Sequence, residues 1–152
     1  MPDYEMICDY VKMQEIRKAS KINICGLMRD YATMIKVLFI CHGNICRSPL
    51  AESVFTNMVS SLGLSDQFTI DSFATSTEEI GNPPHRGTVN KLREVGIPLV
   101  PHRAEQISWP DYAGADYIIG MDSANIRNLN RMLKGDPDGK VYKLLSFAGS
   151  DR

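Results

Sequence analysis

A cysteine and an arginine lie six residues apart in one short segment, Cys41-His42-Gly43-Asn44-Ile45-Cys46-Arg47-Ser48. A thiolate is a strong nucleophile, and a guanidinium can donate two parallel hydrogen bonds to phosphate oxygens. Gly43 and Asn44 tolerate the unusual backbone angles of a tight loop whose successive N–H groups point at an anion. These residue types at this spacing predict that Cys41 attacks phosphorus to form a cysteinyl-phosphate. Arg47 would bind the phosphate oxygens and stabilise their charge.

The residues on either side of this segment predict where it lies in the fold. Residues 37–40 are a continuous apolar run, which is typical of a strand buried on both faces of a parallel sheet. After the segment, apolar residues recur on one helical stripe, namely Ala51, Val54, Phe55, Met58, Val59 and Leu62. The segment would therefore join a strand to the start of a helix, whose N–H groups and partial positive charge attract anions and favour a thiolate. Pro49 suits the first helical turn, and Ser48 can donate a hydrogen bond to the thiolate.

Strand and helix patterns alternate along the rest of the chain. Further strands are predicted at residues 68–70, 117–121 and 141–145, and further helices around residues 89–95 and 126–133. Such alternation implies right-handed β-α-β crossovers. The predicted fold class is α/β, a three-layer sandwich with a four-stranded parallel sheet and helices on both faces. Ligands in such folds bind beyond the carboxyl ends of the strands, which is where Cys41 falls.

Composition and charge argue against several classes of function. The chain has 152 residues and a formal net charge of −1, so it lacks the basic character of proteins that bind nucleic acid or anionic membranes. No apolar run is long enough to span a bilayer, and residues 1–5 lack the basic start of a signal peptide. The four cysteines form no CxxC pair and have no histidine at metal-ligand spacing, which argues against zinc and against a disulfide framework. We therefore predict a cytoplasmic, monomeric protein that needs no metal or cofactor.

Several motifs of this sequence resemble those of one known family. Residues 37–49 look like the signature loop of the low-molecular-weight protein tyrosine phosphatases. The likeness continues through Ala51-Glu52, Asp71-Ser72, Thr75-Ser76 and residues 79–84, 96–98, 102–104 and 116–122. It covers roughly residues 34–150. The resemblance implies hydrolysis of phosphotyrosyl proteins or small aryl phosphates, by a fold with the four-stranded parallel sheet described above.

The resemblance also implies roles for individual residues. Cys41 would be the nucleophile, and the phosphate-binding loop would comprise His42, Gly43, Asn44, Ile45, Cys46, Arg47 and Ser48. A polar network would hold that loop through Asn44, Ser48, Ser72 and His102. Cys46 matches the family's second loop cysteine, which can pair reversibly with the nucleophile, and the alternative is a small buried apolar residue. Ile45 favours an aryl ester, because relatives that hydrolyse phosphoarginine carry threonine there.

The end of the sequence departs from the family pattern. The family's proton donor is an aspartate in an Asp-Pro-aromatic loop after the fourth strand, whereas this sequence ends at Asp151-Arg152. Asp136-Pro137 precedes the last predicted strand, and no proline follows Asp151, so neither aspartate is assigned as the general acid. The predicted parts are an N-terminal extension, 1–33, helical or disordered, and a phosphatase domain, 34–152, without its acid loop and last helix. Because a general acid contributes about 10²–10⁴-fold, we expect impaired turnover of phosphotyrosine.

Two other functions stay open from the sequence. A chain with an anion-binding loop but no acid could be a pseudophosphatase that only binds phosphate or phosphotyrosine. A thiol-dependent arsenate reductase uses the same loop but passes a disulfide through later cysteines, and no cysteine follows Cys46.

Glu78 would add negative charge at the rim of the site and disfavour acidic phosphopeptides. The alternative is that Glu78 is a solvated loop acid with no role in substrate choice.

Overall fold

Four parallel strands form the central sheet. A computed structural model describes residues 34–149, so the predicted N-terminal extension lies outside the described residues. The strands are β1 Ile35–Cys41, β2 Phe68–Ala74, β3 Tyr117–Gly120 and β4 Val141–Lys143, in the spatial order β2-β1-β3-β4. Every pairing is parallel, so all four carboxyl ends meet at one edge of the sheet. The predicted α/β class with a four-stranded parallel sheet is confirmed.

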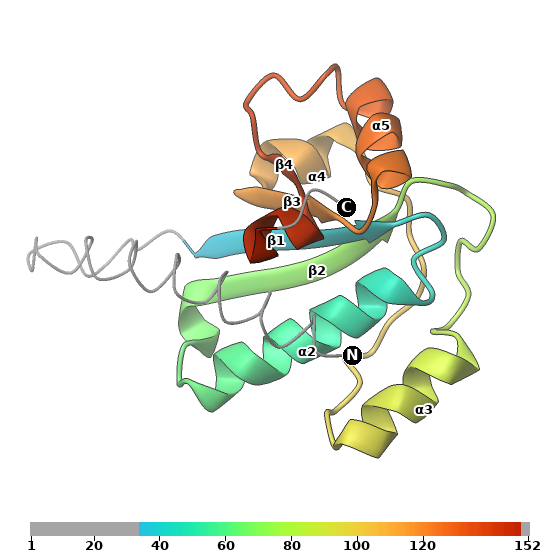
Figure 1. Cartoon of the computed structure of the whole chain (residues 1–152), viewed down its shortest axis with the longest axis vertical. Coiled ribbons are helices and arrows are strands. Elements are labelled where there is room, and N and C mark those ends of the chain that lie inside the picture. Colours follow the sequence, from blue (N-terminus) through green and yellow to red (C-terminus); the bar gives the residue numbers. More distant parts are fainter. Residues whose placement is uncertain (1–33, 150–152) are drawn as a thin grey trace, which may run out of the picture.

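Helices cover both faces of the sheet (Figure 1). On one face α2 Arg47–Ser61 packs Ala51, Phe55 and Val59 against Val37 and Phe39 of β1, and α3 Arg86–Val95 lies beside α2. On the other face lie α4 Trp109–Gly114 and α5 Ser123–Met132, which cover the alternate side chains of β1. A strand that is buried on both faces must be apolar at every position, which explains the continuous run at residues 37–40.

Several segments differ from the sequence prediction. The strand predicted at residues 68–70 continues to Ala74 as β2, and the short 3₁₀ helix η2 Ser65–Gln67 before it was not predicted. The six-residue helix α4 was not predicted, although a capping box between Ser108 and Asp111 marks its start. The strand predicted at residues 141–145 ends at Lys143, and the chain continues as the 3₁₀ helix η3 Leu144–Ala148. The reason is that Lys143 pairs with Gly120, the last residue of β3, so the ladder has no partner beyond that point.

Candidate active site

Cys41 is the last residue of β1 and lies at the carboxyl edge of the sheet. Its side chain is buried. The Sγ atom accepts a hydrogen bond from the backbone N–H of Asn44 at 3.3 Å and lies 3.0 Å from Oγ of Ser48. Ser48 belongs to the first turn of α2, so the sulfur sits beside the amino end of that helix. Strand, loop and helix therefore place the sulfur next to groups that can donate to an anion.

Asn44 holds the loop through both its backbone and its side chain. Its φ angle is 57°, in the left-handed region that asparagine tolerates better than most residues, and its side chain is fully buried. Nδ2 donates to Oγ of Ser48 at 2.9 Å and to Oγ of Ser72 at 3.0 Å. Oδ1 accepts from the backbone N–H of Glu105 at 3.0 Å. Asparagine supplies this backbone angle, two donors and an acceptor in one residue.

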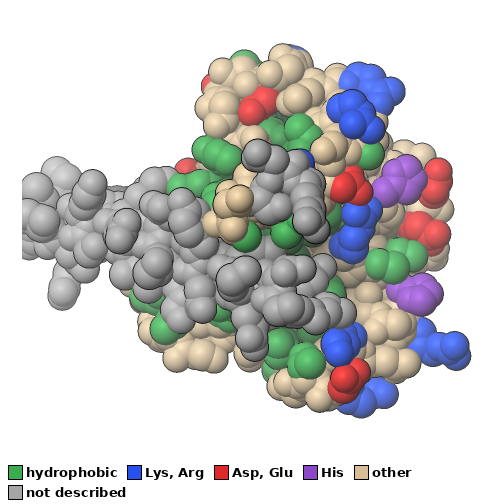
Figure 2. All heavy atoms as spheres, viewed as in Figure 1, with side chains coloured by type: hydrophobic (Ala, Val, Ile, Leu, Met, Phe, Trp, Pro, Cys, Tyr) green, Lys and Arg blue, Asp and Glu red, His purple; other side chains and the backbone are tan. Residues whose placement is uncertain are grey.

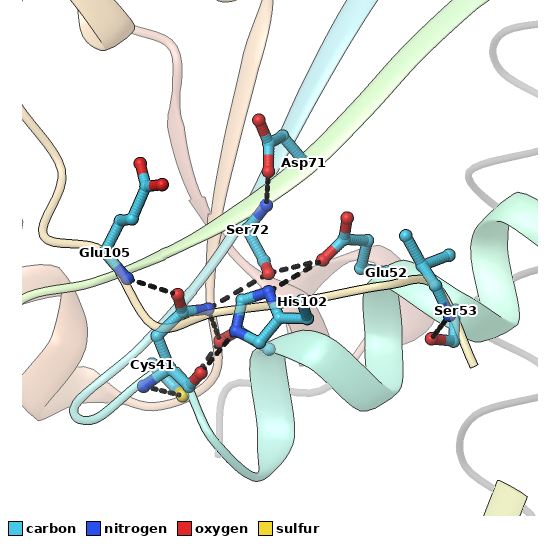
Figure 3. A network of polar contacts seen from close by, with 10 residues as sticks. Cys41, Glu52, Ser53, Asp71, Ser72, His102 and Glu105 are labelled. Atoms are coloured by element: carbon cyan, nitrogen blue, oxygen red, sulfur yellow. Dashed lines mark hydrogen bonds and ion pairs between the residues drawn. The ribbon is translucent and has the colours of Figure 1, made fainter. Parts of the chain in front are cut away.

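Dashed lines in Figure 3 mark the hydrogen bonds of this network, and the donor and acceptor types of the side chains define their direction. The hydroxyls of Ser48 and Ser72 both accept from Asn44, so each keeps its own proton to donate elsewhere. Ser72 donates to Oε2 of Glu52 at 2.5 Å. By the same logic Ser48 donates to the sulfur of Cys41. The amide of Asn44 thus turns the Ser48 hydroxyl toward the nucleophile.

His102 supports the loop from the segment between α3 and α4. Its Nε2 lies 2.6 Å from the backbone carbonyl of Asn44, and because a carbonyl only accepts, Nε2 carries the proton. Its Nδ1 lies 3.9 Å from Oε2 of Glu52, and both side chains are only 5% exposed. The imidazole ring therefore links the backbone of the loop to α2 (Figure 3).

Arg47 is the first residue of α2 and is held by Asp122, the N-cap residue of α5. It donates through NH1 to Oδ2 of Asp122 at 2.6 Å, and Asp122 also caps α5 by accepting from the N–H of Asn125 at 2.8 Å. Burial raises the pKa of Asp122, but the hydrogen bonds from Arg47 and from the N–H groups of α5 outweigh it and hold that pKa below its usual value. Asp122 therefore stays ionised at neutral pH and orients the guanidinium at the sheet edge that carries Cys41.

Comparison with known proteins assigns this arrangement to a family. Residues 36–152 match the family described as low molecular weight phosphotyrosine protein phosphatase. The chain belongs to this family. The phosphatase of that name from Mus musculus is 53% identical over 95 residues, which make up 62% of this chain and 60% of the mouse protein. The chain thus spans 60% of that relative's length.

Solved structures of the family share the fold of this chain. The crystal structure of YfkJ from Bacillus subtilis has a TM-score of 0.75 at 41% identity, with 79% of this chain and 76% of that chain covered. The crystal structure of DARP, a drosophila arginine phosphatase, has a TM-score of 0.70 at 31% identity, with 76% and 74% covered. A protein named for arginine thus occurs among the structural neighbours of a family named for phosphotyrosine.

The structure brings five of the ten predicted site residues of this chain into one hydrogen-bonded cluster. Cys41, Asn44, Ser48, Ser72 and His102 are linked directly. The other predicted residues lie in the same loop or at its end, namely His42, Gly43, Ile45, Cys46 and Arg47. Phosphate binding by this loop stays a prediction.

Cys46 occupies the N-cap position of α2, and its side chain is exposed. The alternative that it is a small buried apolar residue is therefore wrong. Partial desolvation of its sulfur and the negative charge of Cys41 raise the pKa of Cys46. Cys46 is thus protonated at neutral pH, where a thiol is a poor nucleophile.

Two residues of the cluster were given no role from the sequence. Glu52 ends the chain of hydrogen bonds, and Asp122 holds Arg47. Glu52 follows Ser48 by four residues, so the two share one helical face, and this spacing was a usable signal. Asp122 lies two residues beyond the end of β3 and starts a capping box with Asn125, which places it just beyond the carboxyl edge of the sheet.

Glu52 is a buried carboxyl group with a shifted pKa. Burial raises this pKa to about 7, the hydrogen bond from Ser72 opposes the rise, and the charge of Asp71 adds to it. The side chain of Glu52 is 5% exposed, so solvent does little to relieve the charged form. The carboxyl therefore takes up a proton on folding whenever the pH lies between its unfolded and folded pKa values.

Replacing Glu52 by glutamine is expected to change the pH dependence of stability. Because the folded pKa is raised from 4.5 to about 7, the favourable contribution of Glu52 is complete below pH 4.5. That contribution is lost as the pH rises to 7, and the loss approaches about 3 kcal/mol. Glutamine cannot ionise, so Glu52→Gln should gain stability relative to the unsubstituted chain between pH 5 and pH 7.5. Urea unfolding at both pH values measures this gain.

The control for this experiment is Glu94→Gln. Glu94 is an exposed acid on α3 that pairs with Lys91 at 3.0 Å, and its side chain is 68% exposed. This variant should differ from the unsubstituted chain by the same small amount at both pH values. An equally constant difference for Glu52→Gln would contradict the assignment of a raised pKa to Glu52.

Residues 34–149 lack two kinds of feature. This part of the chain contains no cluster of three histidine, cysteine or acidic side chains placed to hold a metal ion. Within the same residues, no helix has the length and apolar character needed to cross a bilayer.

Proposed function

We propose that this chain hydrolyses phosphotyrosine or small aryl phosphate monoesters through a cysteinyl-phosphate intermediate. The observation that carries the proposal is the environment of Cys41. Its sulfur accepts a hydrogen bond from the N–H of Asn44 and lies 3.0 Å from the hydroxyl of Ser48, in the first turn of the helix α2 that begins at Arg47. A nucleophile and an anion-binding helix end meet at one point, which is what displacement at phosphorus requires.

The proposed reaction has two displacements. In the first, the thiolate of Cys41 attacks phosphorus, an S–P bond forms, and the P–O bond to the aryl group breaks, so that the aryl oxide leaves with the electron pair. In the second, water attacks phosphorus, loses a proton to solvent, and returns the S–P electron pair to Cys41. The hydroxyl of Ser48 stabilises the departing thiolate, while Arg47 binds the charged equatorial oxygens.

Asp136 does not suit the part of proton donor to the leaving oxygen. Its Oδ1 accepts from the hydroxyl of Tyr112 at 2.7 Å and from the N–H of Lys140 at 3.0 Å, and its Oδ2 accepts from the N–H of Val141 at 3.0 Å. Burial raises its pKa, but these hydrogen bonds outweigh burial and lower the pKa. Asp136 therefore stays ionised and stabilises the turn before β4. Because Asp136 does not protonate the leaving oxygen, turnover should be fastest for esters whose leaving group is stable as an anion.

Hydrolysis of para-nitrophenyl phosphate tests the proposal. Release of para-nitrophenolate should exceed the uncatalysed rate, and vanadate should inhibit competitively because it is an oxyanion that fits the same loop. An alkyl phosphate should react at least about a hundredfold more slowly, since its leaving group needs a proton. Vanadate binding without turnover would favour the pseudophosphatase. Failure of vanadate to bind at all would remove the phosphate-binding loop from the proposal.

For the natural substrate, we propose the type of leaving group, which is an aryl oxide. Ile45 in the loop favours an aryl ester over phosphoarginine, as the resemblance to the family implies. A comparison of kcat/KM for phosphotyrosine and phosphoarginine separates the two. The cytoplasmic location and the monomeric state remain predictions from the sequence.

A further inference from the structure

A histidine and a glutamate side chain meet at the rim of the candidate site. Nε2 of His42 lies 3.2 Å from Oε2 of Glu78, and these side chains are 52% and 71% exposed. His42 is the residue after the proposed nucleophile, whereas Glu78 comes from the loop between β2 and α3. A carboxylate only accepts, so the ring nitrogen of His42 donates to Glu78. The pair therefore joins the phosphate loop to a different segment of the rim.

The backbone fixes this segment against the loop. The N–H of Thr75 donates to the carbonyl of Cys41 at 3.0 Å, and the N–H of Ser76 donates to the carbonyl of His42 at 3.0 Å. These bonds extend the pairing of β1 with β2 beyond the end of the strands. Glu78 follows two residues later, so its place beside His42 is set by the sheet and does not depend on the side-chain contact alone.

A second acid reinforces the negative charge of this rim. A Cβ atom placed on Gly43 would lie 3.2 Å from Cγ of Glu79, so Glu79 packs directly against the loop. Its carboxylate accepts from the side-chain amide of Asn82 at 2.7 Å, which is a neutral partner. The side of the site formed by residues 78 and 79 thus carries two carboxylates. On the right of Figure 2, histidine and acidic side chains lie close together, with Lys and Arg side chains among them.

We propose that Glu78, oriented by His42, is a specificity-determining residue that favours phosphotyrosyl segments with arginine or lysine beside the phosphotyrosine. The inference rests on the proposed function, because it assumes that the phosphate enters the loop at Cys41. The chain on either side of a bound phosphotyrosine must pass over the rim. A cationic neighbour is attracted there by Glu78 and Glu79, and an acidic neighbour is repelled.

The size of the preference follows from the exposure of the pair. Exposed charge pairs contribute little each, so discrimination of about three- to fivefold is expected between basic and acidic flanking residues. The preference should weaken at high ionic strength, because the Debye length falls from about 10 Å at 0.1 M to about 3 Å at 1 M. A steric preference would not respond to salt.

The experiment uses the full chain with Cys41→Ser, which cannot form the covalent intermediate. Two phosphotyrosyl hexapeptides are titrated, identical except that arginine or glutamate stands on both sides of the phosphotyrosine. The arginine peptide should bind about three- to fivefold more tightly at low salt. This ratio should fall below about twofold when Glu78→Gln is added, and also in 1 M sodium chloride. The matched control, Glu94→Gln, removes an acid on α3 and should leave the ratio unchanged.

The outcomes separate this inference from the proposed function. Equal binding of the two peptides, or a ratio that survives Glu78→Gln, overturns the inference, and so does failure of both peptides to bind. Hydrolysis of para-nitrophenyl phosphate by the chain with Cys41 intact is measured alongside. If that hydrolysis is absent while the ratio depends on Glu78, the specificity of the rim stands and the catalytic proposal fails. If hydrolysis is present while the ratio is one, only the rim inference fails.

Discussion

Replacing Cys41 by serine is expected to lower kcat/KM for para-nitrophenyl phosphate by at least about a thousandfold, which is about 4 kcal/mol of transition-state stabilisation. The physical reason is that a serine hydroxyl does not ionise near neutral pH, so the attacking anion is lost. The buried oxygen would still accept from Asn44 and lie near Ser48, in place of the sulfur. The loop should therefore keep its shape while it loses its nucleophile.

Vanadate or phosphate titration of the same variant provides the control. Affinity for the oxyanion should stay within about tenfold of the unsubstituted chain, because Arg47 and the amide groups of the loop are unchanged. Loss of turnover with retained anion binding is the pattern expected of a missing nucleophile. An unchanged rate in Cys41→Ser would show that Cys41 takes no part in the reaction. Loss of both properties would indicate a disrupted loop.

The central strand and the segment after it could be predicted because local chemistry fixed them. A run of four apolar residues has only one stable position in an α/β fold, at the centre of the sheet, where β1 lies between β2 and β3. The amphipathic pattern after Pro49 then required a helix with its amino end beside Cys41. Strand, loop and helix follow one another along the chain, so no long-range information was needed to relate them.

The elements that were missed depend on contacts far apart in the sequence. α4 has six residues, too few to show a helical period, and the burial of Tyr112 against the sheet stabilises it. Leu144 looks like a strand residue because it is apolar and buried, but it reaches the core from a 3₁₀ turn. The apolar character of Tyr112 and Leu144 predicts that both are buried. It does not predict where the pairing of β3 with β4 stops, which is decided by the length of β3.

In the candidate site, too, residues of one segment could be predicted together, whereas contacts between distant segments could not. Cys41, Asn44, Ser48 and Arg47 lie in one segment, and their proximity could be expected from the loop alone. Glu52 shares a helical face with Ser48, but its hydrogen bond with Ser72 could not be predicted, because Ser72 lies on β2 and faces α2 only once the sheet has formed. The hydrogen bond between His42 and Glu78 has the same origin, since it depends on the register of β1 with β2.

Replacing Asn44 by alanine is expected to lower both stability and turnover. The change removes three side-chain hydrogen bonds, to Ser48, Ser72 and the N–H of Glu105, in a fully buried position. Each lost bond costs roughly 1 kcal/mol, and an alanine at a φ of 57° adds roughly 1 kcal/mol of backbone strain. The free energy of unfolding should therefore fall by about 4 kcal/mol, as measured by urea denaturation at pH 7.

A second variant separates the backbone contribution from the side-chain contribution. Asn44→Gly loses the same hydrogen bonds but tolerates the positive φ, so it should be about 1 kcal/mol more stable than Asn44→Ala. Asn90→Ala, at an exposed position of α3, should change stability by less than about 0.5 kcal/mol.

Turnover is the decisive measurement for Asn44, because it distinguishes orientation of Ser48 from general support of the fold. Without the Asn44 amide, the Ser48 hydroxyl is no longer directed at the sulfur, so kcat should fall by about a hundredfold in conditions where the variant is still folded. KM should change far less, because Arg47 still binds the phosphate. If folded Asn44→Ala kept full kcat, the directed hydrogen bonds from Asn44 through Ser48 to Cys41 would have no catalytic role. Asn44 would then serve stability alone, and the thiolate would owe its reactivity to the amino end of α2 and to Arg47.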